Sequence, residues 1–235
     1  AIAGDGAALR VAGELGQRLV RTGSIGAIGD IEVKSRVTLK GGTVELDATR
    51  DHRVFNADAM SVTDRINVDA SVGAVGARAL RFGEDSVANR LNVGSNLLGQ
   101  LGKASALSFR SYSDIAFASG YTLSGSGLAS LTLDTPLIVS EGGSGSVKAT
   151  DVHLINTSAQ TAGIASVGSG KFVVEAGNRV VVAPSEQGMA ISGFGAVELK
   201  GKEIVAAGKG DLSIGMAGES TTLAIKAGQV TTATA

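Results

Sequence analysis

Cysteine and tryptophan are absent from this chain of 235 residues, and proline occurs only at Pro136 and Pro184. The lack of cysteine excludes disulfides, thiolate metal sites and cysteine nucleophiles together. Aromatic residues are also scarce, at 3%, although 43% of the residues are hydrophobic. This apolar content argues against disorder over the whole length, so a folded core must come from valine, isoleucine, leucine and alanine.

The chain also lacks an excess of charge of either sign and any long hydrophobic run. Its 21 basic and 22 acidic residues leave a net charge of −1. The chain therefore has no strong positive electrostatic field that would attract nucleic acid or an anionic membrane. No run reaches the roughly 18 apolar residues that a membrane-spanning helix requires. We therefore expect no nucleic-acid partner and no membrane span.

Glycine, by contrast, is abundant, and its 34 residues fall between short apolar runs with a two-residue period. These runs are clearest near the C-terminus, at residues 197–199, 203–206, 212–214 and 223–225. Each run hides one apolar face, as a strand does, and each is too short to be stable alone. Such pieces must stack on one another, which predicts a parallel β-solenoid.

The spacing of the runs predicts the size of one coil. Three successive runs make a circuit of roughly 20 to 26 residues, which is typical of a three-sided solenoid. We therefore predict an all-β fold in which residues 1–235 form one parallel β-helix of about ten coils. Residues 69–102 are less regular and rich in glycine and asparagine, and we expect an irregular rung or a loop there.

Two globular folds compete with this prediction. A β-sandwich also has strands at short regular spacing, but its Asn-Gly or Asp-Gly hairpin signals are missing here apart from Asp5 and Gly6. A doubly wound α/β fold needs amphipathic helices between its strands, and none is visible after residue 25. The solenoid therefore remains the favoured fold.

An ordered series of sequence blocks resembles the shaft of filamentous haemagglutinin-like exoproteins, the large adhesins exported by two-partner secretion. The blocks are residues 4–11 followed by Arg21, then 44–49, 66–68, 107–115, 128–133, 135–139, 147–149 and 152–156. The resemblance covers most of the chain, and it rests on the order of weak motifs. The secretion domain and the toxin module that mark the two ends of that family are not recognisable in this segment.

The resemblance implies a fold, a location and a role. It implies a right-handed parallel β-helix that forms an internal segment of a longer exoprotein, secreted to the surface of a Gram-negative bacterium. The parent would serve adhesion, biofilm formation, contact-dependent interaction or virulence. Its partners would be an outer-membrane transporter and glycans or proteins on host or bacterial cells. The segment itself would be a structural shaft and no enzyme.

Carboxylates crowd one stretch of the N-terminal half, and three arginines accompany them. The acids are Glu45, Asp47, Asp51, Asp58, Asp64 and Asp69, and the arginines are Arg50, Arg53 and Arg65. Residues one coil apart in a β-helix lie about 4.8 Å apart, so pairs of these acids suit glycoside hydrolysis or calcium binding. Mixed charge on a solvated face is the simpler interpretation, and no Asp-x-Asp-x-Asp-Gly loop is present.

We therefore assign no catalytic residue, metal ligand or cofactor site. A candidate ligand face consists of Arg50, Asp51, Arg53, Asp58, Asp64 and Arg65. This face makes a carbohydrate-binding or polysaccharide-degrading β-helix the alternative to the shaft. A third hypothesis is a surface for anionic glycans made by the arginines, since all of them except Arg179 precede residue 111.

The remaining polar motifs have structural interpretations. His52 and His153 are expected to be surface residues, because no Gly-x-Ser-x-Gly nucleophile motif accompanies them. The glycine-rich residues 142–146 lack the Gly-Lys-Ser/Thr of a phosphate-binding loop and are expected to form a turn. Asn156 is expected to be a turn residue as well, since asparagine tolerates the left-handed conformation.

Overall fold

The computed structural model is all-β, with 66% of its described residues in strands, and its strands form a β-solenoid of about six turns. It describes residues 2–3, 6–13, 30–31, 37–48, 66–85, 87–88, 90–125, 127–158, 160–163, 168–215 and 220–233. The predicted solenoid class is confirmed, whereas the prediction of about ten coils is too high. That count assumed coiling at a constant short period from the first residue, which the strands described below do not follow.

The chain divides into two compact units. Unit 1 consists of Ala1–Leu80 and Glu84–Tyr112, and unit 2 consists of Arg81–Gly83 and Ser113–Ala235. Two strands, β5 (Ile66–Phe82) and β7 (Ala106–Phe117), contribute residues to both units. The units are described separately below.

Unit 1 combines parallel and antiparallel strands. Its other strands are β1 (Ile2–Ala3), β2 (Ala8–Ala12), β3 (Asp30–Ile31), β4 (Val37–Asp47) and β6 (Leu91–Val93). Strands β4 and β5 are parallel, as a solenoid requires. By contrast, β2 pairs antiparallel with β4, and β1 pairs antiparallel with β3. The expectation of parallel coils from the first residue is therefore wrong for this unit.

The segment 69–102, expected to be irregular, falls into two parts. Residues 69–82 belong to the long regular strand β5, so the expectation is wrong there. Its glycines have a packing role, because a Cβ at Gly76 would collide with the carboxylate of Asp47. The remainder holds bends, the short strand β6 and the helix α1 (Ser95–Gln100), and it is irregular as expected.

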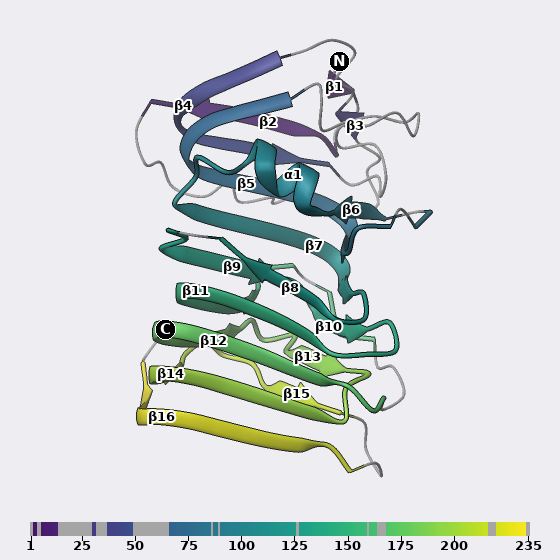
Figure 1. The fold of residues 1–235 in the computed structure, drawn as a ribbon, viewed down its shortest axis with the longest axis vertical. Coiled ribbons are helices and arrows are strands. Elements are labelled where there is room, and N and C mark those ends of the chain that lie inside the picture. The colour runs from purple at the N-terminus through teal and green to yellow at the C-terminus, as the bar shows by residue number, and fades with distance from the viewer. Residues whose placement is uncertain are drawn as a thin grey trace. The chain divides into compact units, whose positions relative to one another are not determined.

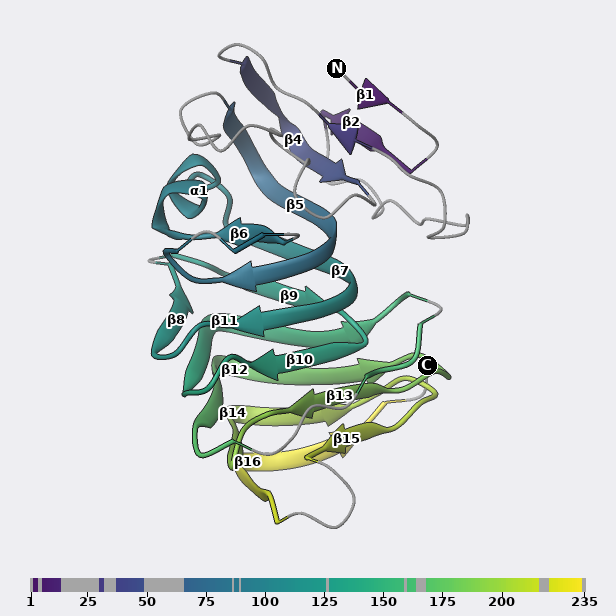
Figure 2. The same ribbon diagram turned by 90° about the vertical axis from the view of Figure 1, so that its right-hand side faces the viewer.

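Unit 2 is built from parallel strands that stack side by side. They are β8 (Tyr121–Ser124), β9 (Ser130–Asp134), β10 (Leu137–Ser140), β11 (Gly145–Asn156), β12 (Lys171–Pro184), β13 (Met189–Ser192), β14 (Ala196–Ala206), β15 (Leu212–Ile214) and β16 (Thr222–Thr232). Strands β9, β11, β12, β14 and β16 follow one another in that order (Figure 1). The end of β7 with β10, β13 and β15 forms a second stack (Figure 2).

The core of unit 2 is a set of apolar ladders in register. Val174 pairs with Leu199 and Leu199 with Ile225, which places them 25 and 26 residues apart in the sequence. Val174 and Leu199 are buried, as are Val152 and Val180 in a neighbouring ladder. Each of these side chains points inward because side chains alternate between the two faces of a strand. The predicted core of aliphatic ladders is thus present in unit 2.

Aromatic residues add a column that the composition did not predict. Phe82, Phe117, Phe172 and Phe194 form a chain of neighbouring rings with centroids 5.1, 5.0 and 5.1 Å apart. All four side chains are fully buried. Rings at this separation attract one another beyond the area that they bury. A sequence with few aromatic residues therefore concentrates several of them in one column.

One coil of unit 2 contributes no strand to the second stack. Leu137 of β10 pairs directly with Ala190 of β13, although all of β11 and β12 lies between them in the sequence. The described residues of the intervening segment, 157–158, 160–163 and 168–170, are not in strands. The coils are therefore unequal in length, which is a second reason why a count from a constant period fails.

Candidate functional site

The candidate ligand face named from the sequence lies outside the described residues. This holds for all of its members, Arg50, Asp51, Arg53, Asp58, Asp64 and Arg65, and also for His52. The face therefore stays a prediction. The other acids of the same stretch, Glu45, Asp47 and Asp69, lie on β4 and β5 of unit 1 and are described.

Glu45 and Asp47 are buried, so the expectation of a solvated face is wrong for them. Arg10 of β2 donates a hydrogen bond to Glu45 over 3.1 Å. Tyr112 donates to Asp47 from its hydroxyl over 2.7 Å, and Arg110 donates over 3.3 Å. Buried carboxylates need such partners, because leaving one unpaired costs several kcal/mol. Both acids thus contribute to the interior of unit 1.

The space beside these two acids is too small for a sugar. A cavity of about 10 Å³ is lined by both of them together with Ser108 and Arg110. Such a volume holds about one water molecule, whereas ligand pockets measure roughly 300–1,000 Å³. A glycoside-hydrolysing carboxylate pair at Glu45 and Asp47 has no room for its substrate.

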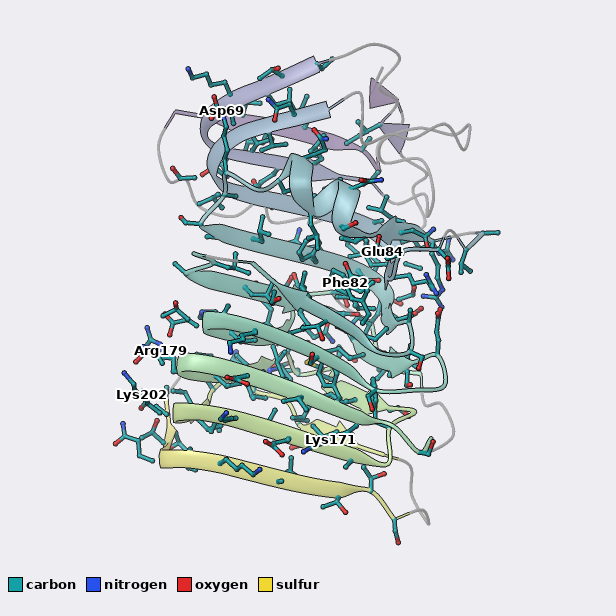
Figure 3. The ribbon with its side chains drawn as sticks, in the orientation of Figure 1. Asp69, Phe82, Glu84, Lys171, Arg179 and Lys202 are labelled. Atoms are coloured by element: carbon teal, nitrogen blue, oxygen red, sulfur yellow. The ribbon has the colours of Figure 1, made fainter. Side chains whose placement is uncertain are left out.

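Asp69, labelled in Figure 3, lies on β5. It lines a larger, open hollow of about 460 Å³ in unit 1. Lys40 of β4 pairs in register with Asp69 of β5, and the ammonium of Lys103 lies 3.3 Å from the Asp69 carboxylate. Glycines 13, 41 and 42 line the rest with Ala70 and Ser71. The hollow therefore offers two cations around one acid and has the volume of a small-ligand site.

Unit 2 carries a row in which an acid is shared by two lysines. Lys148, Glu175 and Lys200 occupy paired positions on β11, β12 and β14. The two ammonium groups lie 3.1 and 3.6 Å from the same oxygen of Glu175. A hydrogen bond from Lys148 is the main cause that holds the pKa of Glu175 below its ordinary value, with Lys200 contributing as well.

A second such group lies one strand further along. Lys171 of β12 donates to Glu198 of β14, and the ammonium of Lys226 on β16 lies 3.1 Å from the same oxygen. Figure 3 shows Lys171 on the outer side of these strands. The hydrogen bond from Lys171 is the first cause that lowers the pKa of Glu198, followed by that from Lys226. Both glutamates are therefore ionised at neutral pH.

His153 lies on β11, on the face opposite the buried side chains of Val152 and Leu154. The surface position expected for it is therefore only partly right, because the imidazole is half-buried. Burial is the main cause that lowers its pKa, opposed by Asp151 and reinforced by Arg179. With a lowered pKa the imidazole is neutral at neutral pH, and no nucleophile is described beside it.

Polar turn residues of unit 2 satisfy backbone groups. Asn156 is buried, and its amide donates to the carbonyls of Gln160 and Gly188 over 3.1 and 2.6 Å. Asp134 accepts from the backbone and the hydroxyl of Thr157 over 2.7 and 2.6 Å. These contacts fit the turn role expected for Asn156.

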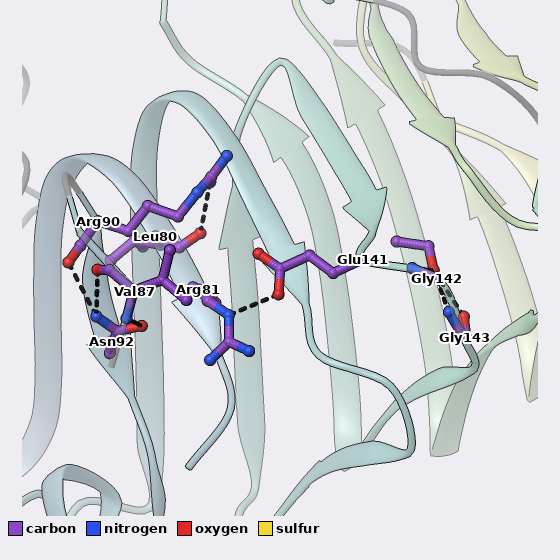
Figure 4. A network of polar contacts seen from close by, with 9 residues as sticks. Leu80, Arg81, Val87, Arg90, Asn92, Glu141, Gly142 and Gly143 are labelled. Carbon is purple, nitrogen blue, oxygen red and sulfur yellow. Dashed lines mark hydrogen bonds and ion pairs between the residues drawn. The ribbon is translucent and has the colours of Figure 1, made fainter. Parts of the chain in front are cut away.

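Of the glycine-rich residues 142–146, Gly145 and Ser146 already belong to β11, and the turn before them is held in the same way. Ser140 accepts from the backbone N–H groups of Gly142 and Gly143 and donates to the Gly143 carbonyl (Figure 4). The next residue, Glu141, accepts from the Nε of Arg81 over 2.6 Å. Because the turn's own serine occupies these N–H groups, they do not form an anion cradle.

Within the part of the chain that is described, no three histidine or acidic side chains gather closely enough to hold a metal ion. The described residues also contain no helix long and apolar enough to cross a membrane. No protein-family model, curated protein or solved structure matches the chain. The resemblance to haemagglutinin-like shafts accordingly stays a prediction.

Proposed function

We propose that this chain is a structural shaft segment of a secreted adhesin on the surface of a Gram-negative bacterium. The observation that carries the proposal is the in-register stacking of β9, β11, β12, β14 and β16 around continuous apolar ladders. Such stacks are stabilised only by contacts between neighbouring coils, so they extend without limit and suit a spacer. We also propose that the coils are right-handed, the hand adopted by nearly all parallel β crossovers.

The ion pairs and hydrogen bonds of the described acids support a shaft without catalysis. Glu45 and Asp47 pair with Arg10, Arg110 and Tyr112. Glu175 and Glu198 are each shared between two lysines. These pairs lower the pKa of Glu175 and of Glu198, whereas a general acid needs a raised pKa. The parent protein would use an outer-membrane transporter for export and bind cell-surface glycans or proteins through other segments.

An export experiment tests the proposal. The 235-residue chain is placed between a two-partner secretion domain and an epitope tag, in Gram-negative cells that carry the matching transporter. We expect the tag to reach the cell surface, where external protease removes it. Retention of the tag inside the cell, under conditions in which a known shaft of similar length is exported, contradicts the proposal.

The hollow beside Asp69 favours one alternative, a carbohydrate-binding or polysaccharide-degrading β-helix. Its volume of about 460 Å³ suits a small ligand, and Asp69, one of the acids of the crowded stretch, lines it. The chain is incubated with neutral and acidic polysaccharides, and reducing ends are measured. Turnover that Asp51→Asn or Asp58→Asn abolishes supports the enzyme and overturns the shaft-only function. Binding without turnover, lost in Asp69→Asn, supports a lectin-like site.

A further inference from the structure

The outer face of unit 2 presents four lysines on four neighbouring strands. Lys148, Lys200 and Lys226 occupy positions linked by the register of β11, β12, β14 and β16, with Glu175 between the first two. Lys171 lies on β12. Neighbouring strands lie about 4.8 Å apart. The three lysines in register are therefore arrayed across the strands, along the direction in which the coils stack. Lys171, whose register partner is Ala196, joins them through the Glu198 carboxylate that it shares with Lys226. We call these four residues the lysine row.

In this row the positive charges lie outermost. The lysine side chains are 45–62% exposed, whereas those of Glu175 and Glu198 are 34% and 8% exposed. Four cations around two ionised acids leave an excess of two positive charges on the row. An anion that approaches from solvent meets the ammonium groups before it meets either carboxylate.

The lysines also keep hydrogen-bonding capacity. Each ammonium has three donors, and each lysine of the row has one acidic partner among the contacts described above. The remaining donors face water. Because the glutamates hold the long side chains in place, an incoming anion meets cations that are already ordered, which lowers the entropic cost of binding.

The chemistry around the row favours a polysaccharide over nucleic acid. Hydroxyl groups of Thr122 and Ser146 lie 2.8 Å apart on the adjoining strands β8 and β11. The phenylalanines described in unit 2 are buried, and the ring of the partly exposed Tyr121 stacks on Phe82, so these rings offer little surface for stacking on a base. Interleaved carboxylates accept hydrogen bonds from sugar hydroxyls but repel the dense phosphates of a nucleic acid.

We propose that the lysine row binds a linear acidic polysaccharide that lies across the strands of unit 2. The anionic groups are carboxylates or sulfates, each held between exposed ammonium groups of successive coils. This binding surface goes beyond the spacer function and uses none of the residues of the candidate ligand face. It gives the shaft an attachment surface of its own.

Binding of the intact 235-residue chain to defined polysaccharides tests the proposal. Immobilised polygalacturonate supplies carboxylates, heparin supplies sulfates, dextran is the neutral control, and double-stranded DNA is the nucleic-acid probe. We expect binding to one or both acidic polysaccharides that weakens as salt is raised, because screening reduces exposed charge interactions. Absence of binding to both at low salt overturns the proposal, and so does equal or tighter binding to DNA.

Two matched pairs of substitutions test whether the lysine row is the binding surface. Lys148→Gln with Lys200→Gln removes two charges from the row, and Lys202→Gln with Lys209→Gln removes two from elsewhere in unit 2. We expect at least a tenfold loss of affinity, about 1.4 kcal/mol, for the first pair and less than about a twofold change for the second. Equal losses would show a general charge effect and overturn the assignment. Circular dichroism and urea unfolding establish that both pairs are folded.

Discussion

At the residue scale, the interior of unit 2 depends on a few large side chains. Phe172 lies between Phe117 and Phe194, with ring centroids 5.0 and 5.1 Å away, and it is fully buried. Elsewhere in the core, the equivalent positions of successive coils carry side chains of similar size. In the phenylalanine column no neighbouring side chain can fill the space of a missing ring. Removing one ring therefore leaves a cavity, because the layers around it are closely packed and cannot collapse.

We therefore expect Phe172→Ala to lower the free energy of unfolding by about 3–5 kcal/mol. Urea unfolding followed by circular dichroism measures the change. Val230→Ala is the matched control, because Val230 is 61% exposed and its truncation should cost within about 0.5 kcal/mol. Similar costs for both variants would show that the column contributes nothing special.

Glu198 makes stability depend on pH. Its pKa is lower in the folded chain than its ordinary value of 4.5, mainly because of the hydrogen bond from Lys171. A lowered pKa means that the unfolded chain binds the proton more readily. The stabilisation is therefore complete above about pH 4.5 and is lost as the pH falls through the folded value.

We expect the free energy of unfolding to fall less steeply on acidification in Glu198→Gln than in the unaltered chain. Urea unfolding from neutral pH down to about pH 3 measures both slopes. Glu186→Gln is the control, because Glu186 is 73% exposed in its pair with Lys209, and exposed pairs contribute little. Identical slopes in all three proteins would contradict this role of Glu198.

At the element scale, turns between strands depend on close backbone approach. Gly170 precedes β12, and a Cβ there would collide with the backbone carbonyl of Gly143 in the preceding turn. The Gly195 N–H in turn donates to the Gly170 carbonyl over 2.8 Å. Three successive coils thus meet at this corner, and any side chain would push them apart.

We expect Gly170→Ala to lower the free energy of unfolding by about 1–3 kcal/mol, since it overpacks a corner that has no room to relax. Gly163→Ala provides the comparison within the same connection. A Cβ at Gly163 would meet nothing closer than 3.9 Å, so its effect should stay within about 0.5 kcal/mol. Equal effects, measured by thermal and urea unfolding, would refute the packing argument.

At the scale of the whole molecule, the described coils of unit 2 end at an uncovered strand. Leu223, Ile225 and Val230 of β16 continue the core ladders and are 45%, 48% and 61% exposed. An exposed apolar edge with unpaired backbone groups is a template for another strand. In a solution of this chain alone, the available partner is the β16 edge of a second copy.

We expect the chain to self-associate with rising concentration, and Val230→Lys to shift it toward the monomer. Gln229→Lys adds the same charge on the same strand, but position 229 lies in the outward-facing register of Glu203, so association should persist. Sedimentation velocity measures the distribution of species. Equal inhibition by the two variants would mean that added charge alone prevents association.

The sequence by itself determined the fold class and the nature of the core. Two-residue alternation in runs such as 197–199, with glycine between the runs, favours stacked strands over the competing folds. It also predicted that Asn156 serves a turn, whereas the hydrogen bond from its amide to Gly188 of the next coil depends on the tertiary structure. The lysine row was visible only as four separate lysines, since its members are separated by coils of unequal length.

Only the tertiary structure decided the number of coils, the antiparallel pairing of β2 with β4, and the burial of Glu45 and Asp47. It also decided which lysines share Glu175 and Glu198. The physical reason is register. Alternation along a strand determines which side chains point inward, whereas the length of each connection decides which residues of successive coils lie side by side.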